Sequence, residues 1–290
     1  MAIFEFKVEI ALGAVPAIEE LLGEHEEQQF MVIEDKPSGR AWLTGYYESR
    51  AEAEAGWKRF AEDLDPEWLA TAPEVSELAD KDWKESYKEH FKAWHFGRLH
   101  WVPVWEREQF KPPAGEEVLW LDPGMAFGTG NHETTRLVVE ELVQIAARRG
   151  TGGRVIDAGC GSGILALSAA KLGFAHVIAF DNDPLAVEIS CQNAGLNALA
   201  GRVDFFVGDL VTGLAGRQAE VVLANIQADI LVKYAPQLLA AVAPTGVLVL
   251  SGILANELGQ VRSAFLALAP TMATDEREMG EWSSLVFARV

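Results

Sequence analysis

The chain of 290 residues is 49% hydrophobic and 23% charged, a balance typical of a globular protein that can bury a core. No apolar run reaches the roughly 18 residues of a membrane-spanning helix, and the start MAIFEFKVEI lacks the basic and apolar regions of a signal peptide. The formal net charge of −19 argues against binding to a nucleic-acid backbone, which requires basic patches. Two cysteines are too few for a disulfide framework. We therefore expect a cytoplasmic monomer that binds neither membranes nor nucleic acid directly.

The N-terminal region has the element order of a small α+β domain. Helical periodicity covers residues 16–25 and 49–64, and strand patterns cover 3–10, 30–34, 41–47 and 73–78. The order β-α-β-β-α-β is typical of a ferredoxin-like fold. We place this domain at residues 1–72 and expect it to recognise a substrate.

Acidic residues are concentrated in the same region. Up to Asp80 the chain has 6 Lys and Arg residues against 19 Asp and Glu residues. Such an excess can serve solubility alone, and it can also attract a basic partner protein. The sequence leaves both interpretations open.

A charged segment separates this region from the rest of the chain. Residues 80–91 (DKDWKESYKEHF) are predicted to be helical, with Trp83 and Tyr87 on one face. We take residues 73–95 as a linker. Strands predicted over 98–104 and 118–121 then lead into the loop at 122–130, DPGMAFGTG.

From residue 134 onward helices and strands alternate strictly. The predicted helices are 135–148, 164–172, 184–196, 229–241 and 256–268, and the predicted strands are 154–157, 176–180, 203–207, 220–224 and 246–250, with a hairpin from 271–278 and 283–288. Helices that alternate with nearly continuous apolar strands indicate a doubly wound, mostly parallel sheet. This second domain spans residues 96–290, and its ligands should bind beyond the carboxyl ends of the strands.

The strongest motif is VIDAGCGSG at residues 155–163, where a predicted strand ends and a helix begins. Gly159, Gly161 and Gly163 allow the backbone to turn sharply and approach a ligand closely. Their G-x-G-x-G spacing differs from the G-x-G-x-x-G of dinucleotide-binding loops. Asp157, before the first glycine, suits a cationic amino acid and disfavours a pyrophosphate. The motif therefore favours S-adenosylmethionine (SAM) over a dinucleotide.

Polar residues also follow the next two strands. Asp181 ends the second strand, where a carboxylate can accept both hydroxyl protons of a ribose. Asp183 precedes Pro184 and is interpreted as a helix cap. Asp209 ends the third strand and could accept from an adenine amino group, although a plain turn aspartate is the alternative.

Asn225 ends the fourth strand. Its amide oxygen could accept a hydrogen bond from a substrate N–H and align the nitrogen lone pair with a methyl group, since alignment accounts for much of the rate of such a displacement. A turn-forming asparagine is the alternative. The sequence at 225–228 is NIQA and not Asn-Pro-Pro-Tyr, which disfavours enzymes that methylate amide or base nitrogens.

Taken together, these motifs resemble one family. They are DPGMAFGTGNHETT at 122–135, VIDAGCGSGIL at 155–165, AFDNDP at 179–184 and ANIQADIL at 224–231, with further matches at 251–254 (SGIL) and 280–282 (GEW). The chain resembles the bacterial ribosomal protein methyltransferases of the PrmA family over nearly its whole length. The resemblance implies a class I SAM-dependent methyltransferase fold behind the small ferredoxin-like domain, and methylation of α-amine and lysine ε-amines of ribosomal protein L11.

The resemblance also implies roles for individual residues. Those expected to meet the substrate amine, and so to be catalytic, are Asn225, Phe127 and Trp282, with Trp282 forming a wall of the amine pocket. The resemblance implies SAM contacts for Thr135, Gly159, Asp181 and Asn225, with Thr129 over the methionine moiety. The strand-end motifs add Asp157, Gly161, Gly163 and Asp209 to the expected SAM-binding residues. His132 is expected to be structural, and no metal ligand is expected.

The connector departs from the family pattern. Residues 91–94 read FKAW where the family usually has a proline after the phenylalanine-x pair, and Tyr87 replaces a common tryptophan. These departures concern the orientation of the domains more than the chemistry. Three other functions stay open: methylation of another protein or of a small-molecule amine, a non-catalytic SAM-binding module on the ribosome, and a nicotinamide oxidoreductase.

Overall fold

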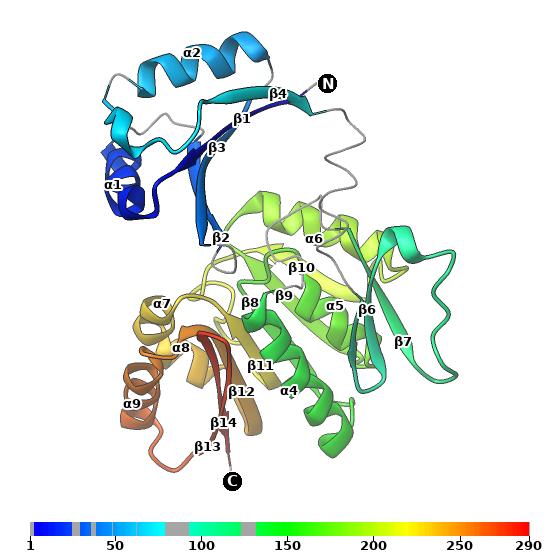
Figure 1. Cartoon of the computed structure of the whole chain (residues 1–290). Coiled ribbons are helices and arrows are strands. Elements are labelled where there is room, and N and C mark those ends of the chain that lie inside the picture. The colour runs from blue at the N-terminus through cyan, green and yellow to red at the C-terminus, as the bar shows by residue number, and fades with distance from the viewer. Residues whose placement is uncertain are drawn as a thin grey trace. The chain divides into compact units, whose positions relative to one another are not determined.

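The computed structural model describes residues 3–24, 30–35, 39–47, 49–61, 63–78, 93–122 and 132–289. The chain divides into two compact units, Met1–His90 and Phe91–Val290 (Figure 1). The predicted linker helix at 80–91 and the loop at 123–130 lie outside the described residues. Among the described residues, no helix is long and apolar enough to cross a membrane.

The first unit is a four-stranded antiparallel sheet with two helices. Its elements are β1 (Ile3–Ile10), a short 3-10 turn (Leu12–Ala14), α1 (Val15–Glu24), β2 (Phe30–Asp35), β3 (Arg40–Tyr47), α2 (Arg50–Phe60), a second 3-10 turn (Pro66–Trp68) and β4 (Glu74–Leu78). The sheet order is β2-β3-β1-β4, which confirms the predicted ferredoxin-like arrangement. Because β4 pairs with β1, the first domain extends beyond its predicted end at residue 72.

The two faces of this sheet differ. Phe6, Val8 and Ile10 of β1 are buried in the core of the unit, and the ring of Phe6 stacks on Trp57 of α2 at 4.7 Å. Lys7, which alternates with these residues, points to the opposite face of the sheet, where its ammonium lies 5.2 Å from the ring centre of Trp42. The strict alternation of β1 therefore separates a packed face from a polar one.

The second unit begins with a small three-stranded sheet made of β5 (Trp94–Phe96), β6 (Leu99–Pro103) and β7 (Glu117–Leu121). A 3-10 turn, Val104–Glu106, follows β6. The β5–β6 pair is antiparallel and the β6–β7 pair is parallel. Trp101 of β6 is fully buried, and its Nε1 donates to Ser168 Oγ at 2.9 Å. This bond satisfies a buried indole N–H and attaches the small sheet to the rest of the unit.

A seven-stranded sheet forms the body of the second unit. Its elements in chain order are α4 (Glu133–Arg149), β8 (Arg154–Ala158), α5 (Ile164–Lys171), β9 (His176–Asp181), α6 (Pro184–Leu196), β10 (Val203–Val207), β11 (Ala219–Asn225), α7 (Ala228–Lys233), α8 (Ala235–Ala240), β12 (Val242–Leu254), α9 (Leu258–Leu268), β13 (Ala273–Met279) and β14 (Trp282–Ala288). The strand order is β10-β9-β8-β11-β12-β14-β13. The first five strands are parallel, and β14 is antiparallel to both of its neighbours.

This order places a topological switch between β8 and β11. From β8 the chain winds outward through β9 and β10, and it then returns to add β11 on the other side of β8. Ligands of such sheets bind at the carboxyl ends of the strands beside the switch. The switch therefore directs attention to the residues that follow β8, β9 and β11.

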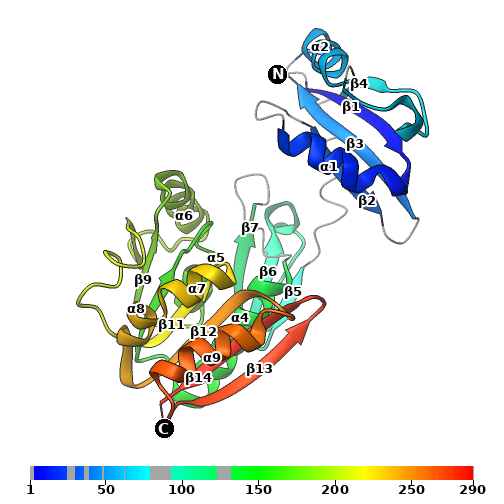
Figure 2. The ribbon, with the colours of Figure 1, turned by 90° about the vertical axis from the view of Figure 1, so that its left-hand side faces the viewer.

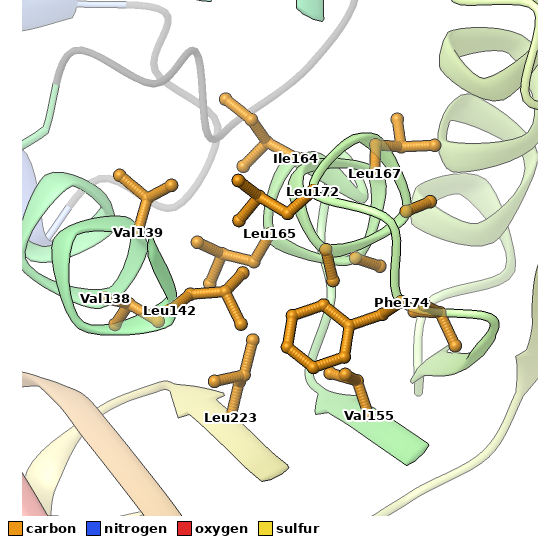
Figure 3. Close-up of a cluster of buried hydrophobic side chains, with 14 of the residues drawn as sticks. Val138, Val139, Leu142, Val155, Ile164, Leu165, Leu167, Leu172, Phe174 and Leu223 are labelled. Atoms are coloured by element: carbon orange, nitrogen blue, oxygen red, sulfur yellow. The ribbon is translucent and has the colours of Figure 1, made fainter. Parts of the chain in front are cut away.

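Helices cover both faces of this sheet. On one face, Val138, Val139 and Leu142 pack with Ile164 and Leu165 against strands β8 and β11 (Figure 3). On the other face, α7, α8 and α9 pack against β11 and β12 (Figure 2). Burial on both sides explains why these strands are continuous apolar runs in the sequence.

One predicted helix, 229–241, is broken in the structure. It forms α7 and α8, which are separated at Tyr234. Pro236 lies in the first turn of α8, where its missing N–H is tolerated. A proline inside a continuous helix would remove a hydrogen bond and clash with the preceding turn, so the chain starts a new helix instead.

Candidate functional site

The glycine-rich loop follows β8 and is attached to the neighbouring strand β9. The backbone N–H groups of Gly159 and Cys160 donate to Phe180 O at 2.9 and 3.0 Å. Gly159 has a φ of +76°, and a Cβ there would lie 2.8 Å from Ile226 Cγ2. Gly163 caps α5 in the left-handed conformation, with a φ of +77°. Glycine is therefore required at both ends of the loop.

Asp181 connects the ends of β8 and β9. Its Oδ2 accepts from the N–H of Gly161 at 2.9 Å, and its Oδ1 accepts from the N–H of Asp183 at 3.0 Å. A carboxylate oxygen can accept more than one hydrogen bond, so both oxygens retain capacity for a ligand. Asp183 accepts from Leu185 N at 2.8 Å and caps α6, which confirms its predicted role as a helix cap.

Asp157 lies beneath the loop with no exposed surface. Its Oδ2 accepts from the N–H of Ala166 at 3.0 Å, while Oδ1 has no hydrogen-bond partner among the described residues. Burial, with a smaller contribution from the charge of Asp181, raises the pKa of Asp157 from its ordinary 3.8 to about 7. The carboxyl group thus holds the first turn of α5. Its predicted contact with a cationic cofactor stays a prediction.

Asn225 and Thr135 are brought together from distant parts of the chain. Asn225 ends β11 and Thr135 lies in the first turn of α4, and the Asn225 Nδ2 donates to Thr135 Oγ1 at 3.3 Å. Behind Asn225, Gly252 has a φ of +80°, and a Cβ on it would lie 2.5 Å from Ile226 O. The close approach of these two backbones at the ends of β11 and β12 fixes the position of the Asn225 side chain.

Trp282 lies next to the start of α4. Its ring meets that of His132 edge to face, with centroids 4.9 Å apart. His132 is the N-cap of α4, where its side chain accepts from the N–H of Thr134. This cap supports the prediction that His132 is structural. Trp282, Thr135 and Asn225 therefore lie around the N-terminal end of α4, whereas Phe127 and Thr129 are outside the described residues.

Asp209 occupies a turn after β10. Its Oδ1 accepts from the N–H groups of Val211 and Thr212 at 2.9 and 2.7 Å, and from Thr212 Oγ1 at 2.8 Å. The hydrogen bonds from Thr212 lower the pKa of this exposed carboxyl group. This geometry is that of the turn aspartate that the sequence left open as an alternative, and the contact with adenine stays a prediction.

Sequence reasoning missed the residues of α6 that support the glycine-rich loop. Ser190 Oγ donates to Gly161 O at 2.8 Å and lies 3.7 Å from the sulfur of Cys160. Asn193 Nδ2 donates to Ser162 O at 2.9 Å. Two polar residues three positions apart on one face of this helix were the available signal, since residues three apart are neighbours on a helix.

Comparison with known proteins agrees with these features. The family model described as "Ribosomal protein L11 methyltransferase (PrmA)" matches residues 9–290. A ribosomal protein L11 methyltransferase of Geobacter metallireducens is 42% identical over 237 residues, which cover 80% of this chain and 76% of that protein. One of Pseudomonas aeruginosa (strain LESB58) is 44% identical over 206 residues, 70% of this chain and 67% of that protein.

A solved structure extends the similarity to the fold. The ribosomal protein L11 methylase of Lactobacillus delbrueckii subsp. bulgaricus superposes with a TM-score of 0.60 at 31% identity, covering 69% of this chain and 99% of that one. The second unit therefore has the class I methyltransferase fold, as predicted. The chain belongs to the PrmA family of ribosomal protein L11 methyltransferases.

Proposed function

We propose that this protein transfers methyl groups from SAM to the α-amine and lysine ε-amines of ribosomal protein L11. The observation that carries the proposal is the Asn225–Thr135 pair at 3.3 Å beside the glycine-rich loop, in a chain whose family match covers residues 9–290. We place target recognition in the acidic first unit, whose charge complements a basic ribosomal protein. The protein acts in the cytoplasm as a monomer.

The chemistry of the residues at the strand ends supports SAM as the cofactor. Gly159 has no side chain to stand between the backbone at the end of β8 and a ligand, and its close packing against Ile226 leaves no room for one. Asp181 offers two acceptor oxygens to a pair of ribose hydroxyls. The Oδ1 of Asp157 is a buried acceptor that has no hydrogen-bond partner among the described residues, and a nearby cation would favour its ionised form. Thr129, outside the described residues, and Thr135, Gly161, Gly163, Asp209 and Asn225 complete the proposed set.

In the methyl transfer, Asn225 positions the attacking amine. Bound SAM supplies a methyl group activated by a positively charged sulfur. Because the Asn225 nitrogen donates to Thr135, the amide oxygen is the atom that accepts from the amine N–H and directs the nitrogen lone pair at the methyl carbon. With SAM bound, the amine held by Asn225 would take the methyl group as the C–S bond electrons return to sulfur, and it would release its proton to water.

The amine must be neutral before it attacks. This costs little for an α-amine with a pKa of about 7.7–8.0 and more for a lysine with a pKa of about 10.4. Trp282 and Phe127 are proposed to exclude water from the amine pocket, because desolvation lowers the pKa of a lysine. No strong general base among the chain's own residues is then needed.

The test is methylation of unmodified ribosomal protein L11 by the purified chain with SAM, read as intact and peptide masses. We expect mass gains in steps of one methylene, and a rate about 100-fold lower for Asn225→Ala, which loses alignment of the amine. Gln192→Ala, which removes an exposed amide on α6, is the matched control and should behave as the wild type.

SAM binding is measured by calorimetry on the same samples. If SAM binds but L11 gains no mass, L11 is not the substrate, and other basic proteins or free amines should be tested. If SAM does not bind, SAM is not the cofactor of this protein.

A further inference from the structure

A second group of ligand-type side chains lies on the small β5-β6-β7 sheet. His95 is on β5, His100 is on β6, and Glu116 directly precedes β7. One ligand atom from each residue lies within 4.8 Å of the other two. None of the three residues takes part in the proposed methyl-transfer site.

The hairpin between β5 and β6 places the two imidazoles together. His95 and His100 are direct cross-strand partners in the antiparallel register, so their side chains lie on one face of the sheet. The rings stack at 4.4 Å with an interplanar angle of 15°. The turn has Gly97 at its first position with a φ of +57°, and a Cβ on it would lie 2.8 Å from Val143 Cγ1. A two-residue turn packed this tightly fixes the register of the pair.

Glu116 faces both imidazoles through one oxygen. Its Oε2 lies 3.5 Å from His95 Nε2 and forms a short hydrogen bond with His100 Nε2. Ligands of a tetrahedral zinc ion, with metal–ligand distances near 2.0–2.1 Å, lie roughly 3.3 Å apart. The His95–Glu116 separation matches that value, and the His100–Glu116 hydrogen bond would open slightly to admit the ion.

Burial around the three residues is graded. The side chain of His100 is 11% exposed and that of Glu116 is 25% exposed, whereas that of His95 is 57% exposed. The ring of Phe110 covers His100, with centroids 5.2 Å apart. The cluster thus has a packed base and an open side, through which an ion can enter and water can complete the coordination.

We propose that His95, His100 and Glu116 bind a zinc ion. Two imidazole nitrogens and one carboxylate oxygen, with the fourth position left to water, form a ligand set that zinc accepts. The bound ion would tie the β5–β6 hairpin to the start of β7. The alternative is that the same residues form only a hydrogen-bonded histidine–glutamate pair that binds no metal.

The test uses the full chain without affinity-tag histidines, stripped of metal with a chelator. Zn²⁺ is titrated by calorimetry, and Co²⁺ is added as a spectroscopic substitute whose visible bands report four-coordinate binding. We expect one ion per chain. His95→Gln and Glu116→Gln should each raise the metal Kd by at least about tenfold, because replacing even a residue that only orients a metal ligand weakens metal binding by about that factor.

His176→Gln is the matched control, because it removes an exposed histidine at the start of β9, outside the cluster. His95 is largely exposed, so His95→Gln should keep the wild-type circular dichroism and thermal melting temperature in chelator. Long-range ¹H–¹⁵N spectra should show two imidazoles that shift with one equivalent of Zn²⁺. The proposal is overturned if the wild type binds no stoichiometric ion, or if His95→Gln binds it as tightly as the control.

Discussion

Asp157 is the second-last residue of β8 and Asp181 is the last residue of the neighbouring parallel strand β9, yet the structure gives them opposite environments. Asp157 is fully buried, holds the first turn of α5, and has its pKa raised to about 7. Asp181 is half-buried and bridges two loops through the N–H groups of Gly161 and Asp183. Two carboxylates near the carboxyl ends of adjacent strands thus differ in burial, and this difference is not visible in the sequence pattern.

The largest expected difference between the two aspartates is the effect of Asp157 on how the free energy of unfolding depends on pH. Its folded pKa of about 7 lies above its ordinary 3.8, so the folded state binds more protons between these values and loses stability as pH rises through them. Asp157→Asn keeps an acceptor for Ala166 and cannot ionise. Relative to the wild type, its free energy of unfolding should rise by about 2 kcal/mol between about pH 5.5 and pH 8.

Urea denaturation across that pH range measures this difference. Asp204→Asn, at an exposed position on β10, is the control for the loss of one aspartate outside the site. A flat difference for Asp157→Asn would mean that the carboxyl group is solvated in solution, and the contrast with Asp181 would disappear.

The next effect concerns SAM affinity at Asp181. Asp181→Ala removes a charged acceptor, and hydrogen bonds to charged groups contribute about 1.5–3 kcal/mol. We expect the Kd for SAM to rise about 10- to 100-fold, measured by calorimetry, with Asp204→Asn again as control. An unchanged Kd would mean that Asp181 only joins the two loops and does not bind SAM.

A smaller effect is expected at Ser190, which supports the glycine-rich loop from α6. Ser190→Ala leaves Gly161 O without its 2.8 Å hydrogen bond and should lower the free energy of unfolding by about 1 kcal/mol. Ser263→Ala is the matched control, because its hydroxyl bonds the backbone of its own exposed helix turn at Gly259 O. Equal losses in the two variants would show that the loop does not depend on α6.

The smallest effect is expected at Asp209. In the structure its carboxylate closes an exposed turn with Thr212, and exposed substitutions usually change stability by no more than about 0.5 kcal/mol. Asp209→Asn should therefore leave the thermal melting temperature nearly unchanged. Its SAM Kd decides the open question, since a rise of about tenfold would favour the adenine contact over the plain turn.

Local periodicity predicted most of the fold. β1 was expected at 3–10 and is found at Ile3–Ile10, because a half-buried strand alternates its side chains strictly. The break at Tyr234 was missed because the apolar pattern continues through Pro236. The short strand β5 was also missed, since the Gly97 turn was not identified in the sequence. That omission hid the pairing of His95 with His100, so no metal ligand was predicted.

The candidate site was only partly accessible from sequence. The glycines of the loop and the strand-end residues could be named, because their spacing follows from backbone conformation. The Asn225–Thr135 hydrogen bond joins positions 90 residues apart, and local patterns give no distances between such positions. Burial of Asp157 could not be foreseen either, since it depends on how α5 packs over the strand.

Cys160 lies in the glycine-rich loop, so its reaction with a thiol reagent can report how often that loop opens. Its thiol is 7% exposed, and burial raises its pKa well above the usual range, so it is protected from alkylation. Cys191 is exposed and should react at once. The slower labelling of Cys160 would therefore report the rate at which the loop after β8 opens. A ligand bound across that loop would slow this labelling.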